Sequence, residues 1–423
     1  MTLTLNKWLN LFTDKQTKQE GFTKTFKIRY STGTIVSIEE HMKKKPLKKS
    51  ILNTLYIVFE QDRKRYLTNF YKKSLDTSSF SPKQRLPLCI HNDKYSQNKN
   101  IIRNTYYKEI LHDTNTIQPN IRNYYDVVID LYKHKIIDYK LMTPSSLKLL
   151  EKGTNLSSIL SAYYFRSSIM NPTIPYAMTT LVESDKIKVF SPTLGWSSYA
   201  YGVLSNSNLY EYVGIDVLSK VCNNTRKLLT KHNIKNEIRC EPSENVAKDK
   251  IFLQKYKNHF DLVFFSPPYY ELELYSGKLQ STNKYKTYTE WLEKYWTPTI
   301  RMCHHILGNQ SLMCYIVSGY NYKGQYMNLS KDMNSISEKE GFHLLRSVNI
   351  SSKNVKITKH RKLGERIYIF KKKGYNISER IMRKMNQITK DCKKTQKKKR
   401  TSKNNTRKGK TKSIKSIFMD MLT

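Results

Sequence analysis

The tetrapeptide Ser266-Pro267-Pro268-Tyr269 holds the residue types with the clearest chemical potential in this sequence. It follows the apolar run at 260–265, which is typical of a central strand buried on both faces. Two consecutive prolines fix the backbone in a rigid, extended turn. The pattern therefore predicts a stiff loop at the carboxyl end of a strand, where ligands bind in parallel sheets.

Such a loop could activate an exocyclic amine of a nucleic-acid base. That amine is a poor nucleophile because its lone pair is delocalised into the ring. If Ser266 Oγ and the Pro267 carbonyl accept the two amine hydrogens, the nitrogen can attack a sulfonium methyl group. Tyr269 could stack on the extruded base. Taken alone, the same four residues also fit an ordinary turn.

A second candidate loop lies upstream, where Ser191 and Pro192 follow a short apolar run and precede Gly195 and Trp196. A glycine here permits close backbone approach to a nucleotide cofactor. About twenty residues further, Asp216 ends the next run, and this spacing suits a carboxylate that binds ribose hydroxyls. An acid at a strand end is also a common helix cap.

The cofactor site is predicted to include one further acid. Glu241 directly follows the run at 237–240, and we assign it to the same site as Asp216.

These residues lie in a region, 161–373, whose pattern predicts an α/β fold. Short β-branched and aromatic runs alternate with helical patterns, notably at 219–232 and 289–306. We expect a Rossmann-like, mainly parallel sheet of seven strands. The candidate strands are 187–191, 210–216, 237–240, 260–266, 311–318, 343–349 and 366–371.

The flanking regions differ in composition. Residues 1–160 predict a basic, mainly helical accessory or recognition region, with packed helices at 51–59 and 125–137 and a loop or linker at 77–104. Residues 374–423 form a basic tail, with a like-charged block at 393–400 that is expected to stay extended. Such a tail could bind phosphates, serve as a nuclear address or simply be solvated.

Charge points to a polyanionic partner. The 423 residues include 75 Lys and Arg against 34 Asp and Glu, a net charge of +41. Nucleic acid is the favoured partner. The alternatives are a membrane surface as partner, or a basic surface that has no specific partner. Between the last two strands lies a candidate phosphate-binding loop, for which a solvated face is the competing interpretation. It contains Lys353, Lys356, Lys359, Arg361 and Lys362.

Other partners are not expected. No run approaches the ~20 apolar residues of a membrane span, so a cytoplasmic or nuclear protein is predicted. A viral replication site or a virion is a further alternative, because the Lys, Asn, Ile and Tyr bias suits the AT-rich genome of a large DNA virus. The six cysteines are scattered without zinc-ligand spacing, so no metal is expected. The oligomeric state is left open.

From about residue 164 to 371 the sequence resembles the amino-methyltransferases of nucleic acids, which modify adenine N6 or cytosine N4. Their catalytic motif is Asp, Asn or Ser before Pro-Pro and an aromatic, which 266–269 matches. Their cofactor loop in one microbial and phage branch is similar to 191–198. The segment containing Phe165 and Arg166 resembles the one that closes over the cofactor's methionine part, and Tyr275 lies in a stretch similar to that branch's continuation. The resemblance implies S-adenosyl-L-methionine as methyl donor and a reversed last hairpin in the sheet.

Two departures from the family pattern leave alternatives open. Ser191 stands where the family usually has an acid, and Ser197 and Ser198 replace later glycines. Cofactor affinity could therefore be reduced, or the chain could be a degenerate nucleic-acid-binding scaffold. DNA is favoured over RNA as substrate, and adenine versus cytosine is not decided.

Overall fold

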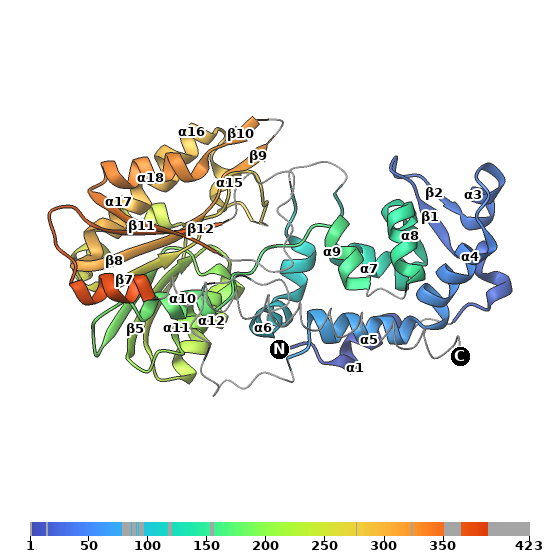
Figure 1. Ribbon diagram of the computed structural model, residues 1–423, viewed down its shortest axis with the longest axis horizontal. Helices are drawn as coiled ribbons and strands as arrows, with labels where there is room; N and C mark the ends of the chain where they lie inside the picture. The colour runs from blue at the N-terminus through green and yellow to red at the C-terminus, as the bar shows by residue number, and fades with distance from the viewer. Residues whose placement is uncertain are drawn as a thin grey trace, which may run out of the picture.

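The structure is a computed structural model, and it describes most of the chain. The described residues are 2–13, 16–77, 86, 90, 92, 97–116, 121–152, 156–275, 277–322, 325–350 and 365–387. Two lobes are visible in Figure 1, one built on a large sheet and one mainly helical.

The large sheet has seven strands in the order β11-β12-β8-β7-β4-β5-β6. The chain runs from β4 outward through β5 and β6, then crosses back to β7 and β8, all parallel. β12 is antiparallel to both of its neighbours, β8 and β11, so it alone runs against the other six strands. The strands are β4 (Ile187–Ser191), β5 (Leu209–Asp216), β6 (Lys235–Cys240), β7 (Phe260–Phe265), β8 (Leu307–Val317), β11 (Phe342–Asn349) and β12 (Arg366–Lys372).

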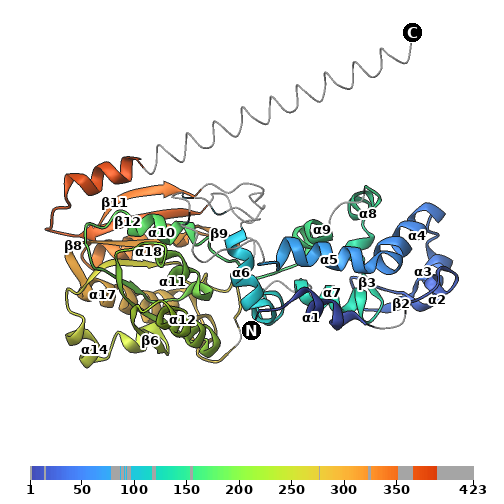
Figure 2. The same ribbon diagram turned by 90° about the horizontal axis from the view of Figure 1, so that it is seen from below.

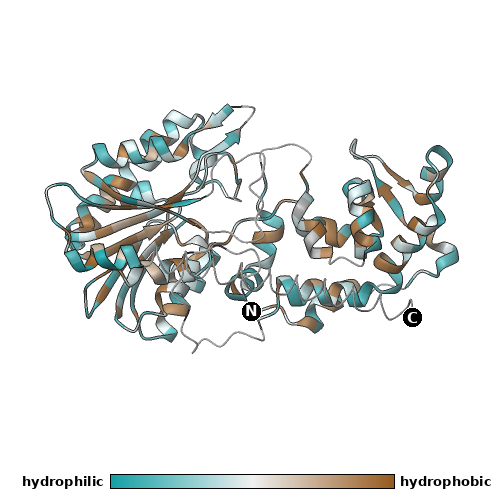
Figure 3. Cartoon of the chain, viewed as in Figure 1, coloured by the Kyte–Doolittle hydropathy of each residue, from teal (hydrophilic) through white to brown (hydrophobic). Residues whose placement is uncertain are grey.

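The sheet is thus a seven-stranded, mainly parallel Rossmann-like sheet with one reversed strand, so the predicted fold class is confirmed. All seven predicted strands are present, with ends shifted by at most a few residues. Leu262, Val263 and Phe264 of β7 are fully buried, as expected for a central strand. Figure 3 shows the apolar character concentrated along the sheet.

Helices cover both faces of the sheet (Figures 1 and 2). One layer contains α10 (Thr173–Thr179), α11 (Ser198–Val203) and α12 (Ser219–Lys231). The other contains α13 (Ser243–Val246), α14 (Lys250–Lys255), α17 (Thr297–Ile306) and α18 (Leu329–Lys339). Between β7 and α17 lie α15 (Ser281–Lys284), α16 (Tyr288–Trp291) and a π-helical turn (Leu292–Trp296), and β9 (Tyr320–Tyr322) pairs with β10 (Gln325–Met327).

The N-terminal lobe is mainly helical, as predicted, but it also contains a small sheet. Its helices are α1 (Leu5–Leu9), α2 (Phe22–Thr25), α3 (Ile38–Lys44), α4 (Lys49–Tyr56), α5 (Arg63–Ser74), α6 (Gln97–Thr105), α7 (Tyr124–Tyr132), α8 (Pro144–Glu151) and α9 (Leu156–Tyr163). The sheet has the order β2-β1-β3, from β1 (Lys27–Arg29), β2 (Ile35–Ser37) and β3 (Ile136–Asp138). The lobe also contains short helical turns at residues 10–12, 19–21, 57–61, 109–113 and 139–142.

Two details of the prediction were wrong. The end of the expected helix at 125–137 is strand β3 instead. The expected loop at 77–104 contains α6, whose polar residues are buried and hydrogen-bonded. Asn104 Nδ2 donates to the carbonyls of Leu3 and Leu75, and Arg103 Nη1 donates to the Ser74 carbonyl. A polar composition therefore concealed a packed helix.

The region after Gly374 is folded where the structure describes it. Residues 379–387 are helical, with Ile381 and Met385 buried. The basic blocks of the predicted tail lie outside the described residues.

Candidate active site

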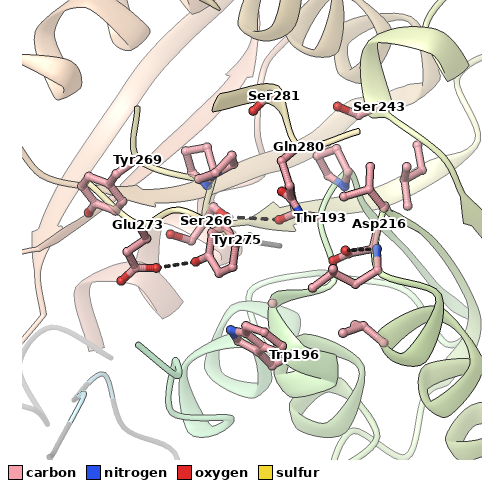
Figure 4. Close-up of a pocket in the computed structure, with 18 of the residues that line it drawn as sticks. Thr193, Trp196, Asp216, Ser243, Ser266, Tyr269, Glu273, Tyr275, Gln280 and Ser281 are labelled. Atoms are coloured by element: carbon pink, nitrogen blue, oxygen red, sulfur yellow. Dashed lines mark hydrogen bonds between the residues drawn. The ribbon is translucent and has the colours of Figure 1, made fainter. Parts of the chain in front are cut away.

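The catalytic and cofactor loops meet at the point where the sheet topology reverses. β4 pairs directly with β7, so the loops that follow them leave the same edge of the sheet side by side. A cavity of about 1120 Å³, part of it open to solvent, lies against both loops (Figure 4).

The catalytic loop is held by hydrogen bonds to its backbone and its serine. Ser266 Oγ donates to the Ile316 carbonyl of β8 at 2.9 Å. Ser266 N donates to Tyr199 Oη at 3.1 Å, and the Ser266 carbonyl accepts from Thr193 Oγ1 at 3.1 Å. Because the hydroxyl hydrogen is directed to Ile316, the lone pairs of Ser266 Oγ are available to accept hydrogens from a ligand.

Tyr269 forms a wall of the cavity and is anchored at its far end. Its hydroxyl accepts from Ser318 N at 3.0 Å and lies 3.2 Å from Ser318 Oγ. Its ring contacts Tyr320 edge to face, and only 7% of the residue is exposed. The ring is therefore fixed beside Ser266, Pro267 and Pro268, which line the same cavity.

In the cofactor loop, Pro192, Gly195 and Trp196 all line the cavity. Gly195 has φ +52°, and a Cβ added there would lie 2.2 Å from the Tyr199 ring. Only glycine fits this position without displacing Tyr199. The loop thus packs its backbone tightly against the residue that holds Ser266.

Asp216 lies at the end of β5 and lines the cavity. Its carboxylate accepts from Leu194 N at 3.1 Å and from Leu218 N at 3.0 Å. Burial raises the pKa of Asp216, and the backbone donors partly oppose this shift. Asp216 therefore organises the cofactor loop and the start of α12, and two oxygens provide more acceptor sites than these two bonds occupy.

Glu241 also lines the cavity, next to the end of β6. Arg239 Nε donates to Glu241 Oε1 at 2.8 Å, which fixes the carboxylate. The neighbouring Glu244 is buried and accepts from Tyr285 Oη and Lys284 Nζ, each at 3.0 Å. The wall on this side is thus acidic.

Ser191 does not lie among the described lining residues. It is fully buried, and its Oγ donates to the Phe264 carbonyl at 2.7 Å. The side chain therefore ties the end of β4 to the end of β7. A carboxylate could not donate this bond unless it were protonated.

The cavity lining also leaves out Phe165 and Arg166. The backbone of Phe165 pairs with Asn123, and the Arg166 guanidinium lies 5.5 Å from the centre of the Tyr124 ring. Instead, the same segment reaches the cavity through Ser168 and Met170. The segment is near the site, but the residues that face the cavity come two to five positions later.

Several lining residues follow the catalytic loop and have no recognisable spacing in the sequence. Glu273 lies beside Ser266 and Tyr269 in Figure 4 and accepts a hydrogen bond from Tyr275 Oη. Gln280 lies on the opposite side, near Thr193. Among these residues, only Tyr275 stood in a segment that the family resemblance indicated.

Tyr295 offers a polar group to the cavity. It lines the cavity and is 3% exposed, and its hydroxyl has no hydrogen-bond partner among the described residues. Burial raises the pKa of Tyr295 well above its ordinary value, so the hydroxyl remains protonated. A buried hydroxyl of this kind favours a ligand that supplies the missing partner.

The remaining expectations concern the phosphate-binding loop, metal ions and membrane spans. Lys353, Lys356, Lys359, Arg361 and Lys362 lie outside the described residues. Within the described part of the chain, no group of three or more His, Cys, Asp or Glu side chains is arranged to hold a metal. No helix in those ranges combines the length and apolar character needed to cross a membrane.

The sheet and the position of the cavity place the chain in the class of Rossmann-like methyltransferase folds. No family model matches the sequence, and no curated protein matches it. The fold is similar to that of a TehB-like SAM-dependent methyltransferase from Corynebacterium glutamicum, at 12% identity, covering 51% of this chain and 94% of that one, with a TM-score of 0.31.

Two further solved structures show the same level of likeness. TrmN from Thermus thermophilus is 12% identical over 48% of each chain, with a TM-score of 0.31. The [4+2]-cyclase SpnF is 9% identical over 44% of this chain and 74% of that one, with a TM-score of 0.30. Likeness at this level leaves the reaction to be argued from the site.

Proposed function

We propose that this protein is an S-adenosylmethionine-dependent methyltransferase that methylates an exocyclic amino group of a base, adenine N6 or cytosine N4, in DNA. When bound, the cofactor supplies a methyl group on a sulfonium centre. The residues present fit this group: Gly195 permits close backbone approach, Asp216 offers carboxylate oxygens, and Tyr295 offers a buried hydroxyl.

The observation that carries the proposal is the orientation of Ser266. Its hydroxyl hydrogen is committed to the Ile316 carbonyl at 2.9 Å, so Oγ faces the cavity as an acceptor. An acceptor at this point withdraws the amine hydrogens from the plane of the base and makes the nitrogen lone pair available. In the transfer, an N–CH3 bond forms as the S–CH3 bond breaks, and the amine then loses one proton.

Two neighbours support the same assignment. The Tyr269 ring, held through Ser318, provides an aromatic face against which a base can stack. Glu273 provides a carboxylate on the same wall, where it can receive the proton that the methylated amine releases. The net charge of +41 supports a nucleic-acid substrate.

The test is transfer of a tritiated methyl group by the purified full-length protein. Duplex DNA, single-stranded DNA and RNA are offered separately under the same conditions. The proposal predicts incorporation into DNA, and preferential incorporation into RNA would make the protein an RNA amino-methyltransferase. No incorporation, together with no calorimetric heat on adding S-adenosylhomocysteine, would contradict enzyme function and favour a nucleic-acid-binding scaffold.

A further inference from the structure

The cofactor loop adopts a backbone conformation that its sequence disfavours. Three consecutive residues have left-handed dihedrals: Gly195 with φ +52°, Trp196 with φ +60° and Ser197 with φ +63°. Glycine takes this conformation freely, but for a residue with a Cβ the left-handed conformation costs about 1–2 kcal/mol of conformational free energy. Trp196 and Ser197 therefore need contacts that hold them in place.

For Ser197, those contacts come from outside the loop. Ser197 Oγ lies 2.6 Å from Tyr106 Oη and 2.7 Å from Thr225 Oγ1, so it sits between two hydroxyls. Thr225 belongs to α12, whereas Tyr106 directly follows α6 in the N-terminal lobe. Tyr106 is 1% exposed, and burial raises its pKa to about 12, so its hydroxyl keeps its hydrogen.

The surroundings of Tyr106 keep it against the loop. Its ring lies 5.8 Å from the Trp196 ring, and Trp196 Nε1 donates to Ser167 Oγ at 3.1 Å. Lys220 of α12 forms an ion pair with Glu109, three residues after Tyr106, and its Nζ lies 6.0 Å from the Tyr106 ring centre. Both residues with strained backbones are thus contacted by the same segment of the N-terminal lobe.

We propose that Tyr106 is a positioning residue for cofactor binding: the N-terminal lobe holds the serine-containing cofactor loop in its left-handed conformation through the Tyr106–Ser197–Thr225 hydroxyl chain. This inference rests on the proposed function. It gives Ser197 a compensating partner at a position where the family that the sequence resembles has a glycine. Tyr106 then contributes to cofactor affinity although it does not itself line the cofactor cavity.

The experiment measures the dissociation constant of S-adenosylhomocysteine for full-length variants by calorimetry. Tyr106→Phe removes one hydroxyl of the chain and is expected to raise the dissociation constant about five- to tenfold. Adding Ser197→Gly to that variant is expected to restore the wild-type value within about twofold, because glycine takes φ +63° without support. This rescue separates positioning of the loop from general damage to the lobe.

Tyr107→Phe is the matched control, because the Tyr107 ring lies 6.1 Å from the Tyr125 ring, measured between ring centres. This substitution is expected to leave the affinity for S-adenosylhomocysteine unchanged. Thr225→Val keeps Tyr106 and removes the other partner, so it tests the same chain if Tyr106→Phe does not fold. The inference is overturned if Tyr106→Phe and Thr225→Val bind like wild type, or if glycine at 197 fails to rescue. A wild-type protein that does not bind S-adenosylhomocysteine would instead contradict the proposed function.

Discussion

At the scale of single residues, the site depends on hydrogen bonds that fix where acceptors point. Ser266, Asp216 and Tyr269 are each held by a partner from another strand or loop: Ile316, Leu194 and Ser318. The sequence could indicate these three residues because Asp216 ends an apolar run, while Ser266 and Tyr269 belong to the Ser-Pro-Pro-Tyr motif that follows another. It could not indicate their partners, which lie between 22 and 50 residues away.

Replacement of Tyr269 should affect the base more than the cofactor. Tyr269→Ala removes the aromatic face, and stacking of a base on such a face is worth about 1–3 kcal/mol. We expect kcat/KM for nucleic acid to fall about tenfold or more, measured by steady-state methyl transfer. Tyr269→Phe keeps the ring and should retain most of this activity. Equal loss in both variants would show that the hydroxyl contact to Ser318, and not stacking, is the important feature.

Asp216 should make cofactor binding depend on pH. Its pKa is raised above the ordinary value of 3.8 by burial. In the proposed site, ribose hydroxyls would bind to the ionised carboxylate. Affinity for S-adenosylhomocysteine is therefore expected to be full above the raised pKa and to be lost as pH falls through it, at a pH above 3.8. Calorimetry between pH 4 and pH 8 measures this. Asp216→Asn should bind more weakly at neutral pH with a flatter pH profile, and an unchanged profile in this variant would exclude Asp216 as the titrating group.

At the scale of elements, long buried strands were predictable and short or polar elements were not. Seven strands of the large sheet carry β-branched and aromatic runs, and all seven were located from the sequence. β1, β2 and β3 have three residues each, too few to show a period, and α6 buries polar groups such as Asn104. The cavity residues Glu273 and Gln280 lie in loops, where no periodicity indicates their direction.

The contact between α10 and α11 gives a test of packing beside the site. A Cβ added at Gly202 would lie 2.2 Å from the Pro172 carbonyl oxygen, which is backbone and cannot rotate away. Alanine usually favours a helix over glycine by about 1 kcal/mol, but overpacking costs about 1–3 kcal/mol. Because the second effect is larger here, Gly202→Ala should lower the thermal unfolding midpoint by several degrees.

Gly21→Ala is the control for this substitution. Its nearest contact would be Thr17 Cγ2 at an ordinary 3.6 Å, so the midpoint should change little. A Gly202→Ala protein as stable as wild type would mean that α10 and α11 pack less closely than described.

At the scale of the whole molecule, the charge of +41 is expected to govern affinity for nucleic acid. Each phosphate neutralised contributes about −0.9 to the slope of log K against log salt for duplex DNA. Binding to DNA should therefore weaken steeply between 50 and 200 mM salt, on the order of a thousandfold for about six contacts. Binding of S-adenosylhomocysteine, measured in parallel, should change far less. A shallow slope for DNA would contradict a mainly phosphate-directed interaction.

The two lobes act together in this account: the sheet lobe supplies the acceptors and the aromatic wall, and the N-terminal lobe supports the cofactor loop through Tyr106. Composition predicted a basic, mainly helical region at 1–160 but gave no sign of this contact, because a single tyrosine within a polar stretch has no recognisable pattern. The hydroxyl chain became visible only once the fold brought residues 106, 197 and 225 together.

The most direct measurement of the central claim is mass spectrometry of nucleosides from DNA reacted with methyl-labelled S-adenosylmethionine. The proposed function predicts labelled N6-methyladenine or N4-methylcytosine. Ser266→Ala should reduce the product about tenfold or more while binding S-adenosylhomocysteine within about twofold of wild type. Label found on a ring carbon or a ribose hydroxyl, or full product formation by Ser266→Ala, would contradict the claim that Ser266 and Tyr269 activate an exocyclic amine.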